Sequence, residues 1–126
     1  GSAVIGTPPR GFNEQPTQSS AGVTIAGLLL DADTADAIPG GFVVILQPGV
    51  TVQQFARQQL DSQVAAIGES DRDGFYVTQP PLPRGYTHSV IVLADGYQVI
   101  AEDDVLPIER TDPDMVEMDP IWMTAE

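Results

Sequence analysis

Short apolar runs rich in β-branched residues recur along residues 22–124, and turn-forming residues separate them. Runs of this length and composition predict β-strands, because branched side chains pack well on a pleated surface. We expect strands at residues 22–30, 41–47, 63–69, 74–79, 86–94 and 97–101. A seventh run at 115–124 contains Pro120, which lacks an amide donor, so this strand should lie at a sheet edge or carry a bulge.

Turn-forming pairs stand between these runs, at Pro39-Gly40, Asp73-Gly74 and Asp95-Gly96. Glycine reaches the positive backbone angles that tight turns need, and aspartate accepts hydrogen bonds from its own turn amides. Seven short strands joined by such turns predict an all-β domain, a seven-stranded antiparallel Greek-key β-sandwich.

One segment departs from the β pattern. TVQQFARQQL, at residues 51–60, carries apolar side chains at spacings of three and four, namely Val52, Phe55, Ala56 and Leu60. This spacing predicts an amphipathic helix, and Thr51 with Gln54 forms a capping box at its start. We therefore expect a short helical insertion between the second and third strands, with Phe55 and Leu60 packed against the sandwich.

Two of the predicted strands, in FVVILQ and SVIVLA, are apolar on both faces. A strand with one face in water should instead alternate between apolar and polar residues. In the second run, Val90 and Val92 can face the core, which leaves Ile91 and Leu93 pointing outward. Because contiguous exposed apolar patches are unusual, we expect a cover here, either the inserted helix or a neighbouring domain or subunit.

The chain has 126 residues, enough for one domain with its own core and too few for two. Residues 1–21 are rich in proline, glutamine and serine, so we interpret them as a flexible linker with Gly1-Ser2 as a cloning scar. The domain then spans residues 22–126. No apolar stretch approaches the roughly 20 residues that cross a bilayer, so membrane insertion is not expected.

The formal charge of the chain is −13, from 18 acidic residues against five basic ones. A surface this acidic repels phosphate backbones, so nucleic acid is not an expected partner. The chain has no cysteine, which excludes disulfides and thiolate metal ligands.

His88 is the single histidine, and Ser89 beside it should point to the opposite face of the same strand. A serine nucleophile needs a base within hydrogen-bond reach, and no G-x-S-x-G turn is present. One histidine without cysteine also falls short of the usual zinc ligand set. We interpret His88 as a partly buried structural residue. We expect no catalytic, cofactor-binding or metal-binding residues, and we do not expect the chain to be an enzyme.

Acidic residues gather at three of the predicted turns, as Asp31, Asp33, Asp36, Asp71, Asp73 and Asp95. Alternate connections of an antiparallel sandwich emerge at the same end, so these turns should share one end of the domain. Neither of the two larger clusters matches the spacing of an EF-hand calcium loop. We interpret the aspartates as turn residues with at most a weak cation site.

A carbohydrate site would need exposed aromatic side chains that stack on sugar rings. The candidates are Tyr76, Tyr86, Tyr97 and Trp122. Tyr86 and Tyr97 have positions more typical of core residues, which leaves Trp122 near the terminus as the best single candidate. A ligand-binding module for calcium or carbohydrate is therefore the alternative to a protein-binding one.

Three stretches, in order, resemble carboxypeptidase regulatory-like domains, a family with a transthyretin-like (prealbumin-like) β-sandwich. The first, IAGLLLDADTADAIPGGFVVIL, is similar to the family's strand, D-x-x-T-G turn, P-I-x-G and second strand. The second, ESDRDGFYV, resembles its T-D-x-D-G-x-F hairpin, at Asp71, Asp73, Gly74 and Phe75. The third, PLPRGYTHSVIVLADGY, resembles its L-P-P-G-x-Y strand and A-x-G-Y ending, at Leu82, Pro83, Gly85, Ala94, Gly96 and Tyr97.

The resemblance covers about residues 23–124, with two departures. Asp36 stands where the family usually has glycine, and residues 48–66 with the expected helix look like an insertion. Family members are generally non-catalytic modules attached to secreted or surface proteins. The resemblance therefore implies an extracellular or cell-surface accessory module of a larger exported bacterial protein, such as a protease, with a neighbouring domain or protein as its partner.

Overall fold

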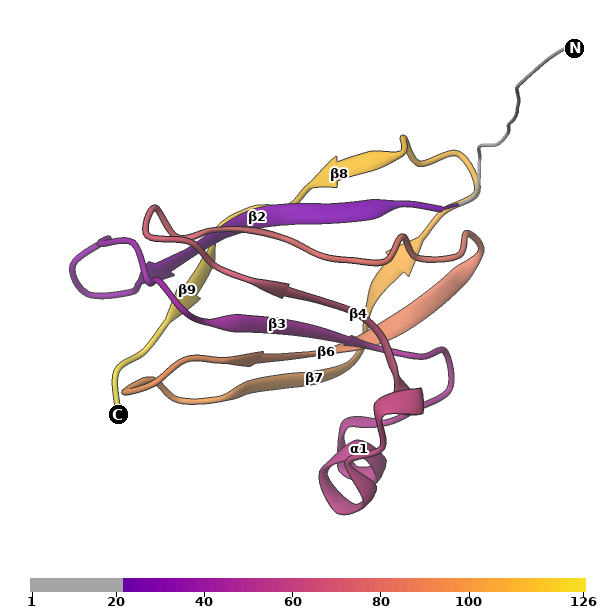
Figure 1. Ribbon diagram of the computed structural model, residues 1–126, viewed down its shortest axis with the longest axis horizontal. Helices are drawn as coiled ribbons and strands as arrows, with labels where there is room; N and C mark the ends of the chain where they lie inside the picture. The colour runs from indigo at the N-terminus through magenta and orange to yellow at the C-terminus, as the bar shows by residue number, and fades with distance from the viewer. Residues whose placement is uncertain (1–21) are drawn as a thin grey trace, which may run out of the picture.

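Two β-sheets pack face to face in the computed structural model, which describes residues 22–126 (Figure 1). The predicted β-sandwich is confirmed, whereas residues 1–21, predicted to be a linker, lie outside the described residues. In the first sheet, called the β3 sheet, every neighbouring pair is antiparallel. Its strands, in spatial order, are β4 (Val64–Glu69), β3 (Phe42–Leu46), β6 (Tyr86–Leu93) and β7 (Ile100–Ile108).

The second sheet, called the β2 sheet, is centred on β2 (Thr24–Asp31). Its other strands are β5 (Phe75–Val77) on one side of β2, and β8 (Met115–Glu117) and β9 (Ile121–Met123) on the other. Strand β5 is antiparallel to β2, but β8 and β9 are parallel to it, so the sandwich is not antiparallel throughout as the sequence predicted.

The parallel pairing follows from where the chain changes sheet. After β7 the chain reaches the start of β2, where the Thr24 amide donates to the carbonyl of Asp114, directly before β8, at 2.8 Å (Figure 1). Residues 109–114 cross between the sheets at this point and reverse the chain direction. Strands β8 and β9 therefore run in the same direction as β2.

The last two predicted strands differ from the observed ones. Residues 118–120 divide the seventh predicted strand into β8 and β9, which pair with the same edge of β2. The described region therefore has eight strands. Pro120 lies between β8 and β9, at a sheet edge as expected. The sixth was predicted at 97–101. Tyr97 instead lies in a turn, with its amide donating to the Ala94 carbonyl, and β7 begins at Ile100 and continues through acidic residues 102–104.

The core lies between the two sheets and takes side chains from both. Val43 and Ile45 point inward from β3, and Val90 and Val92 do the same from β6. The inward placement of Val90 and Val92 confirms the prediction from the alternating pattern. From the β2 sheet, Leu29 packs against them and is fully buried.

The predicted helix is α1 (Val52–Gln58), which lies between β3 and β4 as expected. The Thr51 hydroxyl caps its first turn by accepting a hydrogen bond from the Gln54 amide at 3.0 Å. Gln59 adopts left-handed backbone angles, with φ of 50°, and ends the helix. Leu60 consequently leaves the helical stripe and is half exposed, so the expectation that it packs against the sandwich is wrong.

A short 3-10 helix, η1 (Asp61–Gln63), joins this segment to β4. The Gln63 side chain accepts a hydrogen bond from the Leu60 amide at 3.2 Å, which fixes the entry into η1. Within residues 22–126, no helix is long and apolar enough to cross a membrane.

Candidate protein-binding surfaces

The aspartates of the first two acidic clusters hold their own turns. Asp31 Oδ1 accepts hydrogen bonds from the amides of Asp33 at 2.7 Å and Thr34 at 3.0 Å. Asp71 Oδ1 does the same for Asp73 at 2.9 Å and Phe75 at 3.0 Å. These bonds satisfy turn amides that would otherwise need water, and they explain why aspartate occupies each position.

The three acidic turns lie at one end of the sandwich, on the left of Figure 1, where the chain leaves β2, β4 and β6. This confirms their predicted common location, and the Tyr97 hydroxyl joins two of them by donating to Asp31 Oδ2 at 2.7 Å. In the described part of the chain, no three histidine, cysteine or acidic side chains converge in a way that could hold a metal ion. Because the carboxylates of Asp31 and Asp71 accept hydrogen bonds from their own turn amides, we assign these turns to structure, and weak cation binding stays a prediction.

The hydrogen bond from Tyr97, followed by those from the Asp33 and Thr34 amides, lowers the pKa of Asp31 below its ordinary value. A lowered carboxyl pKa stabilises the fold above the ordinary pKa, and this contribution is lost as the pH falls through the folded-state pKa. We expect Tyr97→Phe to raise the pKa of Asp31, measured by NMR titration of its carboxyl carbon. Tyr86→Phe removes an exposed hydroxyl as the control, and identical Asp31 titrations in both variants would contradict the assignment.

His88 is fully buried, more completely than the sequence indicated. Its Nδ1 lies 2.8 Å from the Leu46 carbonyl oxygen, which can only accept, so Nδ1 carries the proton and donates. Among the described residues, Nε2 has no hydrogen-bond partner. Ser89 is also buried, and its hydroxyl accepts a hydrogen bond from the Asp104 amide at 3.1 Å. Both side chains are thus engaged with the β3 and β7 backbones.

The aromatic candidates do not form a shared platform. Tyr76 is buried in the core, where burial raises the pKa of its hydroxyl to about 12, and Tyr97 is half-buried. Tyr86 and Trp122 are exposed. Tyr86 begins β6, at the end of the sandwich away from the acidic turns, whereas Trp122 pairs with Leu30 next to the acidic turn that follows β2. The two exposed rings therefore lie at opposite ends of the sandwich.

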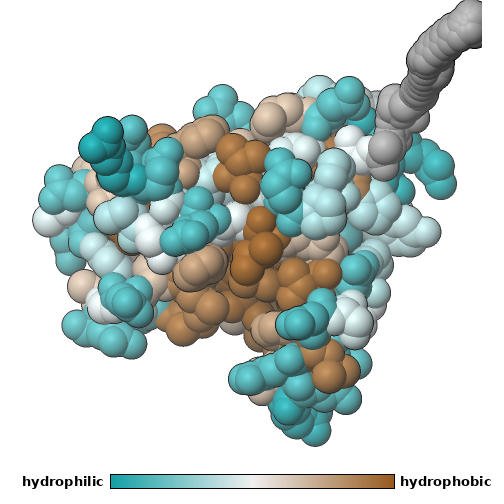
Figure 2. All heavy atoms as spheres, in the orientation of Figure 1, coloured by the Kyte–Doolittle hydropathy of each residue, from teal (hydrophilic) through white to brown (hydrophobic). Residues whose placement is uncertain are grey.

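An apolar surface covers the outer face of the β3 sheet; we call it the outer patch and define it as Phe42, Val44, Ile67, Ile91 and Leu93. Phe42 pairs directly with Leu93, and Val44 pairs with both Ile67 and Ile91, so the five side chains form one cross-strand cluster. Figure 2 shows apolar side chains gathered over β3 and β6 beside the helix. The predicted two-faced apolar character of these strands is confirmed.

Helix α1 covers one half of the outer patch. Val44 and Ile91 are buried in a second, smaller cluster against which Val52 and Phe55 pack. The helix is fixed in place by β7, because Asp103 Oδ1 accepts a hydrogen bond from the Val52 amide at 2.7 Å. A carboxylate at this position also interacts favourably with the positive end of the helix. The cover is therefore a fixed part of the fold.

The other half of the outer patch is uncovered. Phe42, Ile67 and Leu93 are 39%, 44% and 39% exposed, although they continue the same apolar face. Phe42 and Leu93 also line a shallow hollow of about 330 Å³ with Val99, which is itself more than half exposed. Of the two covers expected from the sequence, the helix is confirmed over one half of the outer patch, and a neighbouring domain or subunit over the exposed half stays a prediction.

We expect Phe55→Ala to lower the free energy of unfolding by about 1–2 kcal/mol, because the half-buried ring loses less than a fully buried one would. The change can be measured by urea denaturation. Gln53→Ala, at an exposed position of the same helix, should be nearly neutral. Equal effects of the two substitutions would show that α1 does not stabilise the β3 sheet.

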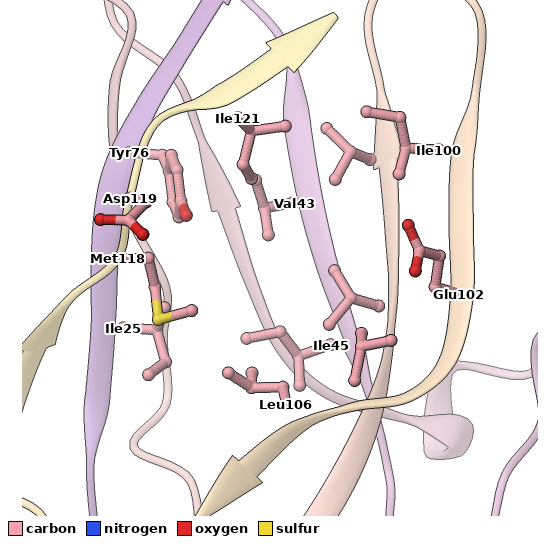
Figure 3. Close-up of a pocket in the computed structure, with 13 residues that line it drawn as sticks. Ile25, Val43, Ile45, Tyr76, Ile100, Glu102, Leu106, Met118, Asp119 and Ile121 are labelled. Carbon is pink, nitrogen blue, oxygen red and sulfur yellow. The ribbon is translucent and has the colours of Figure 1, made fainter.

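A second apolar surface is a cleft between the two sheets, with a volume of about 290 Å³. It opens between β7 and the segment that joins β8 to β9, and Figure 3 shows its side chains. The floor consists of core residues, among them Ile25, Val43 and Ile45. Met118 and Glu102 stand on its two sides. Local sequence patterns did not indicate this cleft, because its walls are the regions where the predicted strands differ from the observed ones.

Comparisons with known proteins support the fold. No protein-family model matches the sequence, and no characterised protein sequence matches it. Among solved structures, the chain is similar to a type II cohesin–X-dockerin complex from Acetivibrio cellulolyticus, with a TM-score of 0.50 and 16% identity over 82% of this chain and 58% of that one. It is also similar to the major pilin subunit of Bacillus cereus, with a TM-score of 0.50 and 15% identity over 87% of this chain.

The chain spans 58% of the matched chain in the first of these structures and 31% of the matched chain in the second. At this level of identity the likeness concerns the fold, which is an immunoglobulin-like or prealbumin-like β-sandwich.

Proposed function

We propose that this chain is a non-catalytic accessory domain of a larger exported bacterial protein, and that it docks onto another protein domain through the uncovered half of the outer patch. The observation that carries this proposal is the exposure of the directly paired Phe42 and Leu93, with Ile67 exposed diagonally across from Phe42, on a sheet face whose other half is already buried under α1. A contiguous apolar area of this kind is typical of a surface that is covered in the assembled protein.

The resemblance to carboxypeptidase regulatory-like domains supports an accessory role in an extracellular or cell-surface protein, and a protease is the host that we propose. Two solved structures of similar fold are a cohesin–dockerin complex and a pilin subunit, proteins whose names describe assembly with other proteins. The acidic charge of −13 indicates the chemistry of the partner, which should surround its apolar contact with basic residues.

The test uses the remainder of the full-length protein, produced separately, and measures its affinity for this domain by calorimetry. Leu93→Glu places a charge in the outer patch and should weaken binding about tenfold, which corresponds to about 1.4 kcal/mol. Thr87→Glu introduces the same charge at an exposed position of the same strand and should change affinity less than about twofold. Equal losses, or no association of the unmodified domain, would contradict the proposal.

A further inference from the structure

The cleft lies between two free sheet edges. Strand β7 is the last strand of the β3 sheet, and β8 and β9 lie on the outer side of β2 in the other sheet. At one end the edges are joined, because the Gln98 amide donates to the Thr124 carbonyl at 2.8 Å. Beyond this bond the sheets separate, and the apolar floor of the cleft is open to solvent.

The two sides of the cleft combine exposed apolar side chains with acidic ones. Val105 and Met118 line it while 46% and 37% exposed. Glu102 lies on the β7 side and Asp119 on the opposite side, next to Met118 (Figure 3). Within residues 22–126, no basic side chain lines the cleft, so these carboxylates face a binding space without a countercharge from the lining residues.

We propose that an extended, basic segment of a partner protein binds in this cleft and pairs with the free edge of β7 at Ile100–Glu102. An added strand gains its affinity from main-chain hydrogen bonds to the edge and its specificity from alternate side chains that enter pockets. The site is separate from the outer patch, because it lies between the sheets and the outer patch lies on the outer face of one of them.

The register of β7 indicates which side chains the segment should carry. Ile100 pairs with the inward-pointing Val92, and Glu102 pairs with the inward-pointing Val90, so both face the interior. Residues directly opposite each other on paired strands share a face. The segment should therefore place an apolar residue opposite Ile100 and a basic residue, two positions away, opposite Glu102. The apolar side chain would enter the floor, and the basic one would pair with Glu102 and Asp119.

Charge also argues against a second copy of this chain as the occupant. A second β7 on the same edge would bring the acidic run Glu102–Asp104 close to its own copy, and each chain carries a net charge of −13. Like charges placed opposite each other destabilise strand pairing. The same acidic run favours a basic segment, so the edge is protected from self-association and open to a partner of opposite charge.

The experiment uses the full chain and a fluorescein-labelled nine-residue peptide that alternates threonine and valine, with arginine in place of the third valine. We expect saturable binding by fluorescence anisotropy below about 1 mM peptide. Glu102→Lys should weaken binding about tenfold, whereas Asp33→Lys, the same charge change in an exposed turn, should alter it less than about twofold. Melting temperatures establish that both variants are folded.

Two further peptides test the mode of binding. Replacing arginine by glutamate should abolish binding through repulsion, and replacing the central threonine by proline should abolish it by removing an amide needed for pairing. By NMR, β7 amides that point away from β6 should exchange quickly in the free chain and slowly with peptide.

Several results would overturn the proposal. The proposal is wrong if the arginine peptide does not bind at about 1 mM, or if the proline or glutamate peptide binds as tightly as the arginine peptide. It is also wrong if Glu102→Lys and Asp33→Lys change the affinity for the arginine peptide equally. Slow exchange of these β7 amides in the free chain would show that a second copy or another part of this chain already fills the cleft.

Discussion

The variant His88→Ala should lower the free energy of unfolding by about 3–5 kcal/mol, a large share of the total stability of a domain this size. His88 is fully buried on β6, and its ring holds the β3 backbone through the hydrogen bond from Nδ1 to the Leu46 carbonyl. Alanine removes the donor and leaves a cavity that the surrounding strands cannot fill. Guanidinium denaturation monitored by circular dichroism measures the loss.

A matched substitution separates the hydrogen bond from the packing. In His88→Asn, the side-chain amide nitrogen takes the place of Nδ1 and can still donate to Leu46, while most of the ring volume is lost. We expect the asparagine variant to be about 1 kcal/mol more stable than the alanine variant, the typical net value of one hydrogen bond. If both variants were as stable as the unmodified domain, His88 would not be the structural residue that its burial indicates.

Local patterns predicted the strands that form the centre of the β3 sheet. In β3 and β6, alternate apolar residues enter two different clusters, one between the sheets and one under α1. The same pattern indicated that Ile91 and Leu93 need a cover, and the capping residue Thr51 marked the start of that cover. These features depend on residues close in the chain, which is why they can be read from the sequence.

The cleft could not be predicted in the same way. Strand β7 carries Glu102, Asp103 and Asp104, and acidic residues have a low propensity for strands. The strand forms because its backbone pairs with β6 along most of its length. The parallel pairing of β8 and β9 with β2 depends on a crossing between sheets that no local pattern encodes. The cleft arises from the relative position of these two edges, so it depends on tertiary structure alone.

Gly74→Ala is expected to lower the free energy of unfolding by about 2–5 kcal/mol, for two physical reasons. Gly74 has a φ of 78°, a left-handed conformation that alanine adopts at a cost of about 1–2 kcal/mol. An added Cβ would also lie 2.6 Å from the Leu29 carbonyl oxygen, so β2 or the turn would have to move. Thermal unfolding followed by circular dichroism provides the measurement.

Gly40→Ala provides the control that isolates the second reason. Gly40 has a similar φ of 72°, but an added Cβ would meet nothing within 4 Å, so only the backbone cost of about 1–2 kcal/mol applies. A larger loss for Gly74→Ala would show that the close approach of the turn to β2, where the Gly74 carbonyl accepts a hydrogen bond from the Leu29 amide at 2.8 Å, leaves no room for a side chain. Equal losses would mean that β2 or the turn accommodates the added methyl group at little cost.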